Sequence, residues 1–227
     1  PNDDRVIQEK GSKRVMLKNV QEAKFKYVLA PISKVALAPA DAARVSFDAF
    51  FTHTVMHELM HGLGPHQVKG SGEAVRLVLK DTYSAIEEAK ADISGLWALQ
   101  QLADKGVISK DVADTMYTTF LASAFRSIRF GVTEAHGKGV SLQISDLLDR
   151  GAYVVNADGT FAVVDAKISE AVAGLTHDLM TIEAEGRYDD AQALLAKAMV
   201  IRPEVQRVLD KLKGVPVDIE PSFLPIQ

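Results

Sequence analysis

The hydrophobic positions near the start of the chain recur with the period of an α-helix. Between residues 19 and 30 they fall on one face of a predicted helix, and we expect Pro31 to end that helix. These positions are Val20, Ala23, Tyr27 and Val28. The following residues, 31–45, predict a surface connection with some extended character.

The same period continues through most of the chain, and Ser46 is placed to cap one of these helices. The predicted helices cover about residues 47–61, 73–103, 111–129, 140–150, 165–186, 188–200 and 203–213. A glycine-rich loop is expected at 131–139, and a hairpin at 152–164, where two β-branched and aromatic runs flank a turn ending in Gly159. We therefore predict a mainly α fold with one small β-hairpin, in one mostly helical domain over residues 1–227.

The amino-acid composition argues against several classes of binding partner and metal ligand. The chain is 47% hydrophobic and 25% charged, with a formal net charge of -4, so neither nucleic acid nor an anionic membrane is an expected partner. No apolar run approaches the length of a membrane span, about 20 residues. The absence of cysteine fits a reducing compartment and predicts a cytoplasmic protein. It also restricts any metal site to His, Asp and Glu ligands.

A candidate metal site lies within the segment HTVMHELMHG at residues 53–62. His57 and His61 are four residues apart, so a helix places them on one face about 5–6 Å apart at Cβ, and both can reach one ion. Glu58 lies about 100° further round the helix, where it can act as general base on a water at the metal. The alternative is two ordinary histidines on a partly buried helix without a metal.

The helix expected at 73–103 offers a third ligand. One of its faces combines two acids with small residues that would let another helix approach closely; the face comprises Ser84, Glu88, Ala91, Asp92 and Gly95. If this face meets the histidine helix, Glu88 can bind the metal and Asp92 can accept the spare ring N–H of a ligating histidine. This is the arrangement of thermolysin-like zinc peptidases, whereas the alternative is a solvated acidic face.

Four stretches in order resemble the dipeptidyl peptidase III family of zinc exopeptidases. They are PNDDRVIQEKGSKRVMLKNV before the candidate site, HELMHGLG in it, EEAKAD at 87–92 and EAHG at 134–137. The resemblance spans residues 1 to about 140 and implies zinc bound by His57, His61 and Glu88, with Glu58 activating the water. It further implies that Glu87 supports the ligands, His136 stabilises the oxyanion and Asn2 helps hold the amino terminus of the substrate.

Two departures from the family pattern point to one of its branches. The motif at His57 has five residues, where the family usually has His-Glu-x-x-Gly-His, and the interval from His61 to Glu88 is short. Both features resemble a divergent bacterial and plant branch in which a Nudix domain can precede the peptidase-like part. Because the family cleft lies between two lobes, we expect the chain to be a C-terminal part of a longer protein and to contribute the zinc lobe.

The predicted function is zinc-dependent peptide hydrolysis, with release of N-terminal dipeptides from short peptides and Glu58 as general base. The expected cofactor is Zn²⁺, and the expected partners are a short peptide and a missing N-terminal lobe of the same protein. The isolated chain could then be inactive. The alternative is a zinc-stabilised regulatory or interaction module, without peptidase activity, attached to an upstream Nudix-like domain.

Overall fold

The computed structural model describes residues 9–11, 15–220 and 222. Its helices and strands are α2 (Lys18–Lys24), the π-helical turn η1 (Phe25–Leu29), α3 (Ala30–Ala36), α4 (Pro39–Ala42), α5 (Phe47–Met60), α6 (Val75–Val78), the 3-10 turn η2 (Lys80–Thr82), α7 (Tyr83–Asp104), α8 (Lys110–Ser127), the 3-10 turn η3 (Ile128–Phe130), α9 (Ala135–Asp149), β1 (Tyr153–Val155), β2 (Phe161–Val163), α10 (Asp165–Glu185), α11 (Tyr188–Ala198) and α12 (Pro203–Lys211). The predicted mainly α fold with one small hairpin is confirmed.

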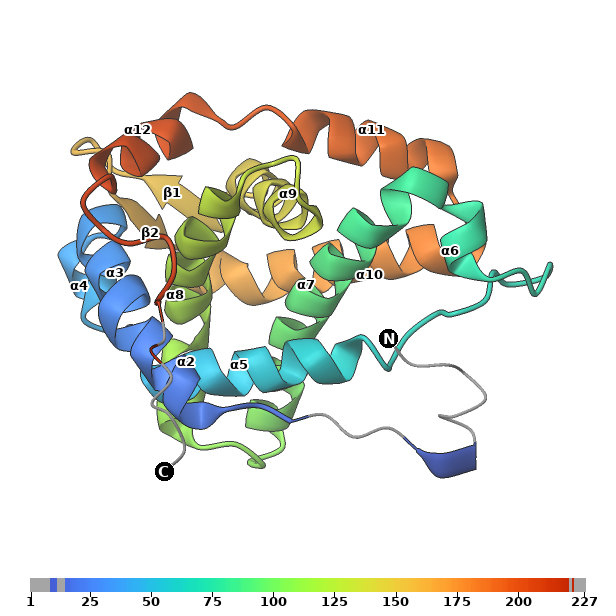
Figure 1. Cartoon of the computed structure of the whole chain (residues 1–227), viewed down its shortest axis with the longest axis horizontal. Coiled ribbons are helices and arrows are strands. Elements are labelled where there is room, and N and C mark those ends of the chain that lie inside the picture. Colours follow the sequence, from blue (N-terminus) through green and yellow to red (C-terminus); the bar gives the residue numbers. More distant parts are fainter. Residues whose placement is uncertain (1–8, 12–14, 221, 223–227) are drawn as a thin grey trace.

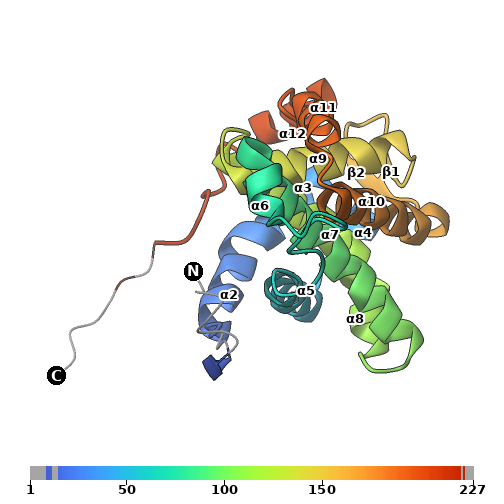
Figure 2. The same cartoon turned by 90° about the vertical axis from the view of Figure 1, so that its right-hand side faces the viewer.

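Helix α7 lies at the centre of the molecule. Helices α5, α8, α9 and α10 all pack against it. In Figures 1 and 2, α11 and α12 lie on the side opposite α5, with α7 and α9 between them. One connected cluster of buried apolar side chains extends from α3 through α7 and α8 to α12. No helix in the described part of the chain is long and apolar enough to cross a membrane.

Two locally encoded features agree with the sequence-based prediction. The Ser46 side chain accepts a hydrogen bond from the Ala49 amide and so caps α5. Strands β1 and β2 pair antiparallel, with Tyr153 opposite Val163. The turn between them needs Gly159, whose φ of 84° falls in the left-handed region. Short-range signals therefore sufficed for these elements.

The expected end of the first helix at Pro31 is wrong. The chain stays helical from Lys18 to Ala36, with Pro31 near the start of α3 and the π-helical turn η1 directly before it. Proline has no N–H to donate, and the wider turn accommodates the missing bond. Residues 31–45 are consequently not an extended surface connection, because Ile32 and Ala36 are buried in the core.

Two other boundaries also differ from the prediction. The long helix expected from about residue 73 begins only at Tyr83, after α6 and a turn at Lys80, whose φ is 50°. The glycine-rich segment 131–139 is a loop only in its first part, because α9 starts at Ala135. His136 therefore lies in the first turn of a helix, and this placement fixes its direction relative to α7.

Candidate metal centre

Glycines allow the helices that bear the site residues to approach closely. A Cβ atom on Gly95 of α7 would lie 3.2 Å from the backbone nitrogen of His57 on α5. On the other side of α7, a Cβ on Gly139 of α9 would lie 3.1 Å from the backbone nitrogen of Ala89. Side chains from three helices therefore meet at α7, as the small-residue face of that helix predicts for α5.

Three potential ligand atoms form a compact triangle at this meeting point. The Nε2 atoms of His57 and His61 are 3.0 Å apart, and they lie 3.4 and 3.7 Å from Oε2 of Glu88. Ligand atoms about 2.0–2.2 Å from a tetrahedral zinc ion are about 3.3–3.6 Å from one another. The observed triangle has close to this size, so the residues fit a zinc ion.

The carboxylate of Glu88 has an unusual environment for a buried acid. Its Oε2 atom is buried and accepts no hydrogen bond of normal geometry within the described residues. Imidazole nitrogens of His57, His61 and His136 nevertheless lie within 3.7 Å of it. Buried carboxylates are rarely left without a partner, and a cation shared with the histidines would supply one.

Each histidine of the triangle uses its other ring nitrogen to contact an acid on α7. Nδ1 of His57 is 2.6 Å from Oδ1 of Asp92, and Nδ1 of His61 is 2.9 Å from Oε1 of Glu87. These contacts orient both rings and leave Nε2 of each ring as the atom available to a metal. Such carboxylate–histidine pairs are characteristic of ligating histidines.

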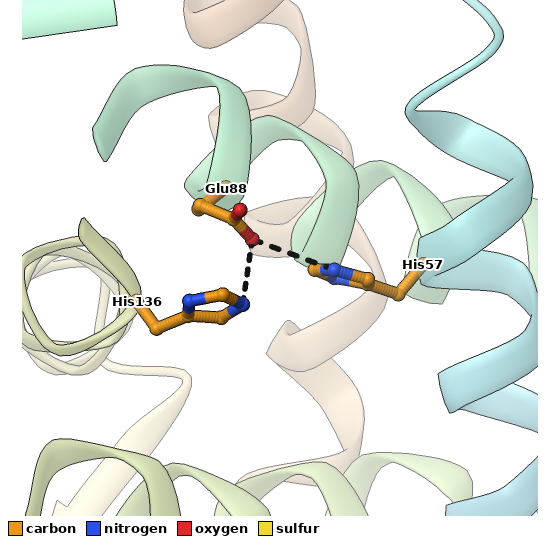
Figure 3. Close-up of side chains that lie close together, drawn as sticks. All are labelled: His57, Glu88 and His136. Carbon is orange, nitrogen blue, oxygen red and sulfur yellow. Dashed lines mark ion pairs between the residues drawn. The ribbon is translucent and has the colours of Figure 1, made fainter. Parts of the chain in front are cut away.

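His136 approaches the same carboxylate from α9. Its Nε2 atom is 2.9 Å from Oε2 of Glu88, and its ring stacks on His57 at 6.0 Å between centroids. Figure 3 shows the Glu88 carboxylate directed between the rings of His57 and His136.

Ligand atoms of His57, Glu88 and His136 all lie within 4.8 Å of one another, so these three residues could also hold an ion. We favour His61 over His136 as the second histidine ligand. The His136 side chain is 59% exposed, and its other ring nitrogen lacks the carboxylate contact that His61 has, within the described residues.

The electrostatics of the site favour a positive charge. Burial opposes protonation of His57, but Asp92, Glu88 and Glu58 outweigh it and raise its pKa to about 9. Burial likewise opposes ionisation of Asp92, but its hydrogen bond with His57 lowers its pKa. The adjacent Glu88 carboxylate, whose Oε2 atom lies 2.9 Å from Nε2 of His136, raises the pKa of His136. Carboxylates that favour a proton on an imidazole also favour a metal cation at the same place.

Glu58 faces the open side of the site. It lines a cavity of about 170 Å³ together with His57 and His136. It also lines a neighbouring apolar groove beside Leu17 and Leu59. A reactant in the cavity would thus lie next to Glu58 and both of these histidines. Asn2, the remaining predicted site residue, lies outside the described residues.

Several polar residues around the site were not predicted from the sequence. Nε2 of His53 is 2.9 Å from the backbone oxygen of Asp92, and Gln143 donates to the Asp92 carboxylate over 3.4 Å. The buried side chains of Lys90 and Glu183 lie beyond Glu87. Of these four residues, only Lys90 had a signal in the local sequence. It follows Glu87 at a spacing of three residues, which suits an ion pair on one face of a helix.

The chain is similar to two solved structures of dipeptidyl-peptidase III over 98% of its length. Identity is 64% to the protein from Corallococcus sp. strain EGB, with a TM-score of 0.93, and 42% to the protein from Caldithrix abyssi, with a TM-score of 0.94. The chain spans 42% and 43% of those two proteins.

A curated relative carries a different name. Nudix hydrolase 3 of Arabidopsis thaliana is 48% identical over an alignment of 228 positions, which covers 98% of this chain and 30% of that protein. No family model matches the chain. The predicted resemblance to the dipeptidyl peptidase III family is confirmed, and it covers nearly the whole chain rather than thinning after about residue 140.

Proposed function

We propose, with the similarity to dipeptidyl-peptidase III as the premise, that this chain is the zinc-binding part of a peptidase. The proposed reaction is release of N-terminal dipeptides from short peptides. The observation that carries the proposal is the convergence of two Nε2 atoms, from His57 and His61, on a buried oxygen of the Glu88 carboxylate. Among the residues that the structure describes, this oxygen accepts no hydrogen bond of normal geometry. Two histidines and one glutamate are a ligand set of catalytic zinc sites.

His57, His61 and Glu88 would hold the ion, and Asp92 and Glu87 would hold the two rings in place. Bound zinc supplies Lewis acidity, which polarises a carbonyl group and makes water more acidic. Glu58 lines the cavity beside the site and would take a proton from the attacking water and deliver it to the leaving amine.

His136 would stabilise the oxygen of the scissile carbonyl as negative charge develops on it. Its ring reaches the site from a separate helix, and its side chain stays partly open to the cavity. A donor held in advance where charge develops lowers the barrier of the reaction. The amino terminus of the peptide would be held partly by Asn2 and partly by the lobe that this chain does not contain.

Dipeptide release by the full-length protein tests this proposal. We expect mass spectrometry to detect N-terminal dipeptides from short peptides, a chelator to stop their release, and zinc to restore it. Glu58→Gln should retain bound zinc and lose about 10²–10⁴-fold in kcat, the usual contribution of a general base. Activity retained in this variant would exclude the proposed role of Glu58.

The similarity to Nudix hydrolase 3 supports one competing function. In that case the chain is a zinc-stabilised module that regulates a Nudix-like domain or recruits partners to it, and it cleaves no peptide. Zinc binding without cleavage of any member of a broad peptide library would favour this module. Chelator-sensitive cleavage that depends on Glu58 would exclude it.

A further inference from the structure

Lys90 is buried completely in the centre of the molecule. Its side chain is 0% exposed. Its ammonium group donates hydrogen bonds to three acceptors in the interior. Nζ donates to the backbone oxygens of Met60 and Leu63, each over 3.1 Å, and to Oε1 of Glu87 over 2.9 Å. An ammonium group has three N–H donors, so each donor has one partner. This complete pairing explains how the charge is tolerated in the interior.

Two of these acceptors belong to the end of the histidine helix. Met60 is the last residue of α5, and Leu63 lies in the turn that follows. Carbonyl groups at the end of a helix lack partners within the helix and carry a partial negative charge. The Lys90 ammonium binds these carbonyls on both sides of His61 in the sequence, so it holds in place the backbone that carries this ligand.

The third acceptor links Lys90 to the His61 ring. Oε1 of Glu87 lies 2.9 Å from Nζ of Lys90 and also 2.9 Å from Nδ1 of His61. Burial opposes ionisation of Glu87, but the hydrogen bond with His61 and the charge of Lys90 outweigh it and lower its pKa to about 2. Lys90 therefore contacts both the backbone around His61 and the carboxylate that orients its ring.

Glu183 of α10 closes the network on the side away from the metal centre. It is 0% exposed, its Oε2 atom lies 3.9 Å from Nζ of Lys90, and neither oxygen forms a hydrogen bond of normal geometry within the described residues. Burial, together with the charge of Glu87, raises its pKa to about 9 despite Lys90. With Glu183 neutral, Glu87 is the anion that pairs with Lys90.

We propose that Lys90 is a positioning residue for the metal centre, which fixes the backbone and the ring of His61 through the α5 carbonyls and Glu87. The proposal rests on the proposed function in one respect, namely that His61 is a metal ligand. Lys90 does not touch the metal position or a substrate. Loss of its ammonium group therefore affects the second histidine selectively and leaves His57 and its partner Asp92 in place.

The test compares Lys90→Met with the unaltered full-length protein. Methionine has a similar length and can fill the buried space, but it donates no hydrogen bond. We expect zinc affinity, measured by competition with a chromophoric chelator, to fall about 10–100-fold, as for other residues that support ligands. At saturating zinc, X-ray absorption at the zinc edge should show two imidazole ligands in the unaltered protein and a reduced imidazole contribution in the variant.

Three further variants separate positioning from general destabilisation. Lys90→Arg retains a charge and several donors and should keep both imidazoles and most of the affinity. Leu99→Ala creates a cavity at a fully buried position of the same helix. It should lower the melting temperature without changing zinc affinity. If Lys90→Met does not fold, Lys90→Gln, which is polar and neutral, takes its place and should show the same selective loss.

The possible failures are distinguishable. An unaltered protein that binds no zinc would overturn the proposed function and this inference together. Zinc binding in the unaltered protein, with affinity within about threefold and two imidazoles in Lys90→Met or its substitute, would overturn the role of Lys90 alone. Equal losses of affinity in Lys90→Met and Leu99→Ala would also overturn it, because the effect would then follow stability.

Discussion

The interface of α5 with α7 and the region around the hairpin are both well buried, but they differ in chemistry. Around the hairpin the buried contacts are mainly apolar and aromatic, although the buried Asp41 carboxylate accepts a hydrogen bond from the Val163 amide. Phe161 is 0% exposed, and its ring meets Phe125 of α8 edge to face, with centroids 4.8 Å apart. At the α5–α7 interface, by contrast, histidines and carboxylates are enclosed together with Lys90.

This difference separates the residues that stabilise the fold from those that form the site. Burial of apolar surface is the dominant favourable contribution to folding, so the hairpin region stabilises the molecule. Burial of charged groups costs free energy unless they are paired. The α5–α7 interface keeps such groups, including a Glu88 oxygen that has no hydrogen bond of normal geometry in the described part of the chain. That is the expected property of a site whose partner is a ligand.

The largest expected effect comes from truncation on the apolar side. Phe161→Ala should lower the free energy of unfolding by about 3–5 kcal/mol, because it leaves a cavity between β2 and α8. The zinc affinity of the folded protein should not change. Chemical denaturation and zinc titration measure the two quantities. Val154→Ala, at a partly exposed position of β1, is the control and should cost much less. A large loss of zinc affinity in Phe161→Ala would mean that the two regions are not separable.

A bulky residue between α5 and α7 should lower both the stability of the fold and the zinc affinity. Gly95→Val places side-chain atoms against the backbone of His57 and should cost about 1–3 kcal/mol of stability through overpacking. It should weaken zinc binding as well, because α5 must move away from Glu88. Gly95→Ala, whose Cβ would lie 3.2 Å from the His57 nitrogen, should show the same changes to a smaller degree. Unchanged zinc affinity in both variants would mean that the site tolerates separation of the helices.

Removal of one charge next to a ligand should weaken zinc binding more than it weakens folding. Asp92→Asn retains an oxygen for Nδ1 of His57 but loses the negative charge, so zinc affinity should fall about 10–100-fold, or about 1.4–2.7 kcal/mol. Isothermal titration calorimetry measures this change. Asp104→Asn, at the exposed end of the same helix, provides the matched control. Equal affinities for the two variants would rule out a supporting role for Asp92.

Replacement of the titrating Glu183 carboxyl group should change the pH dependence of stability. Because the pKa of Glu183 is raised to about 9, the folded state retains a proton that the unfolded state releases above about pH 4.5. Stability attributable to this group therefore falls as pH rises towards 9. The Glu183→Gln variant has no carboxyl group to titrate at this position. The free energy of unfolding of the variant, relative to that of the unaltered protein, should therefore increase between pH 5 and 9. Parallel stability curves for the two proteins, from thermal unfolding across this range, would argue against a neutral Glu183.

Prediction from the sequence succeeded where the signal was local. The cap at Ser46, the hairpin turn at Gly159 and the common face of His57 and His61 each depend on residues a few positions apart. Prediction failed where packing overrode a local signal. Pro31 lies within a helix because a π-helical turn precedes it, and the segment of His136 is helical although its glycines suggested a loop.

By itself, the sequence determined that the chain is mainly helical and that two histidines and a following glutamate share one helix. It did so because helical geometry relates neighbouring residues by a constant rotation. Only the tertiary structure decided that His61 contacts Glu87, that His57 contacts Asp92, and that Lys90 binds the end of α5. These pairs join residues 26, 35 and 30 positions apart. These contacts form because Gly95 lets α5 approach α7 closely. The small residues on this face of α7 permit a close approach, but they do not specify which helix makes it.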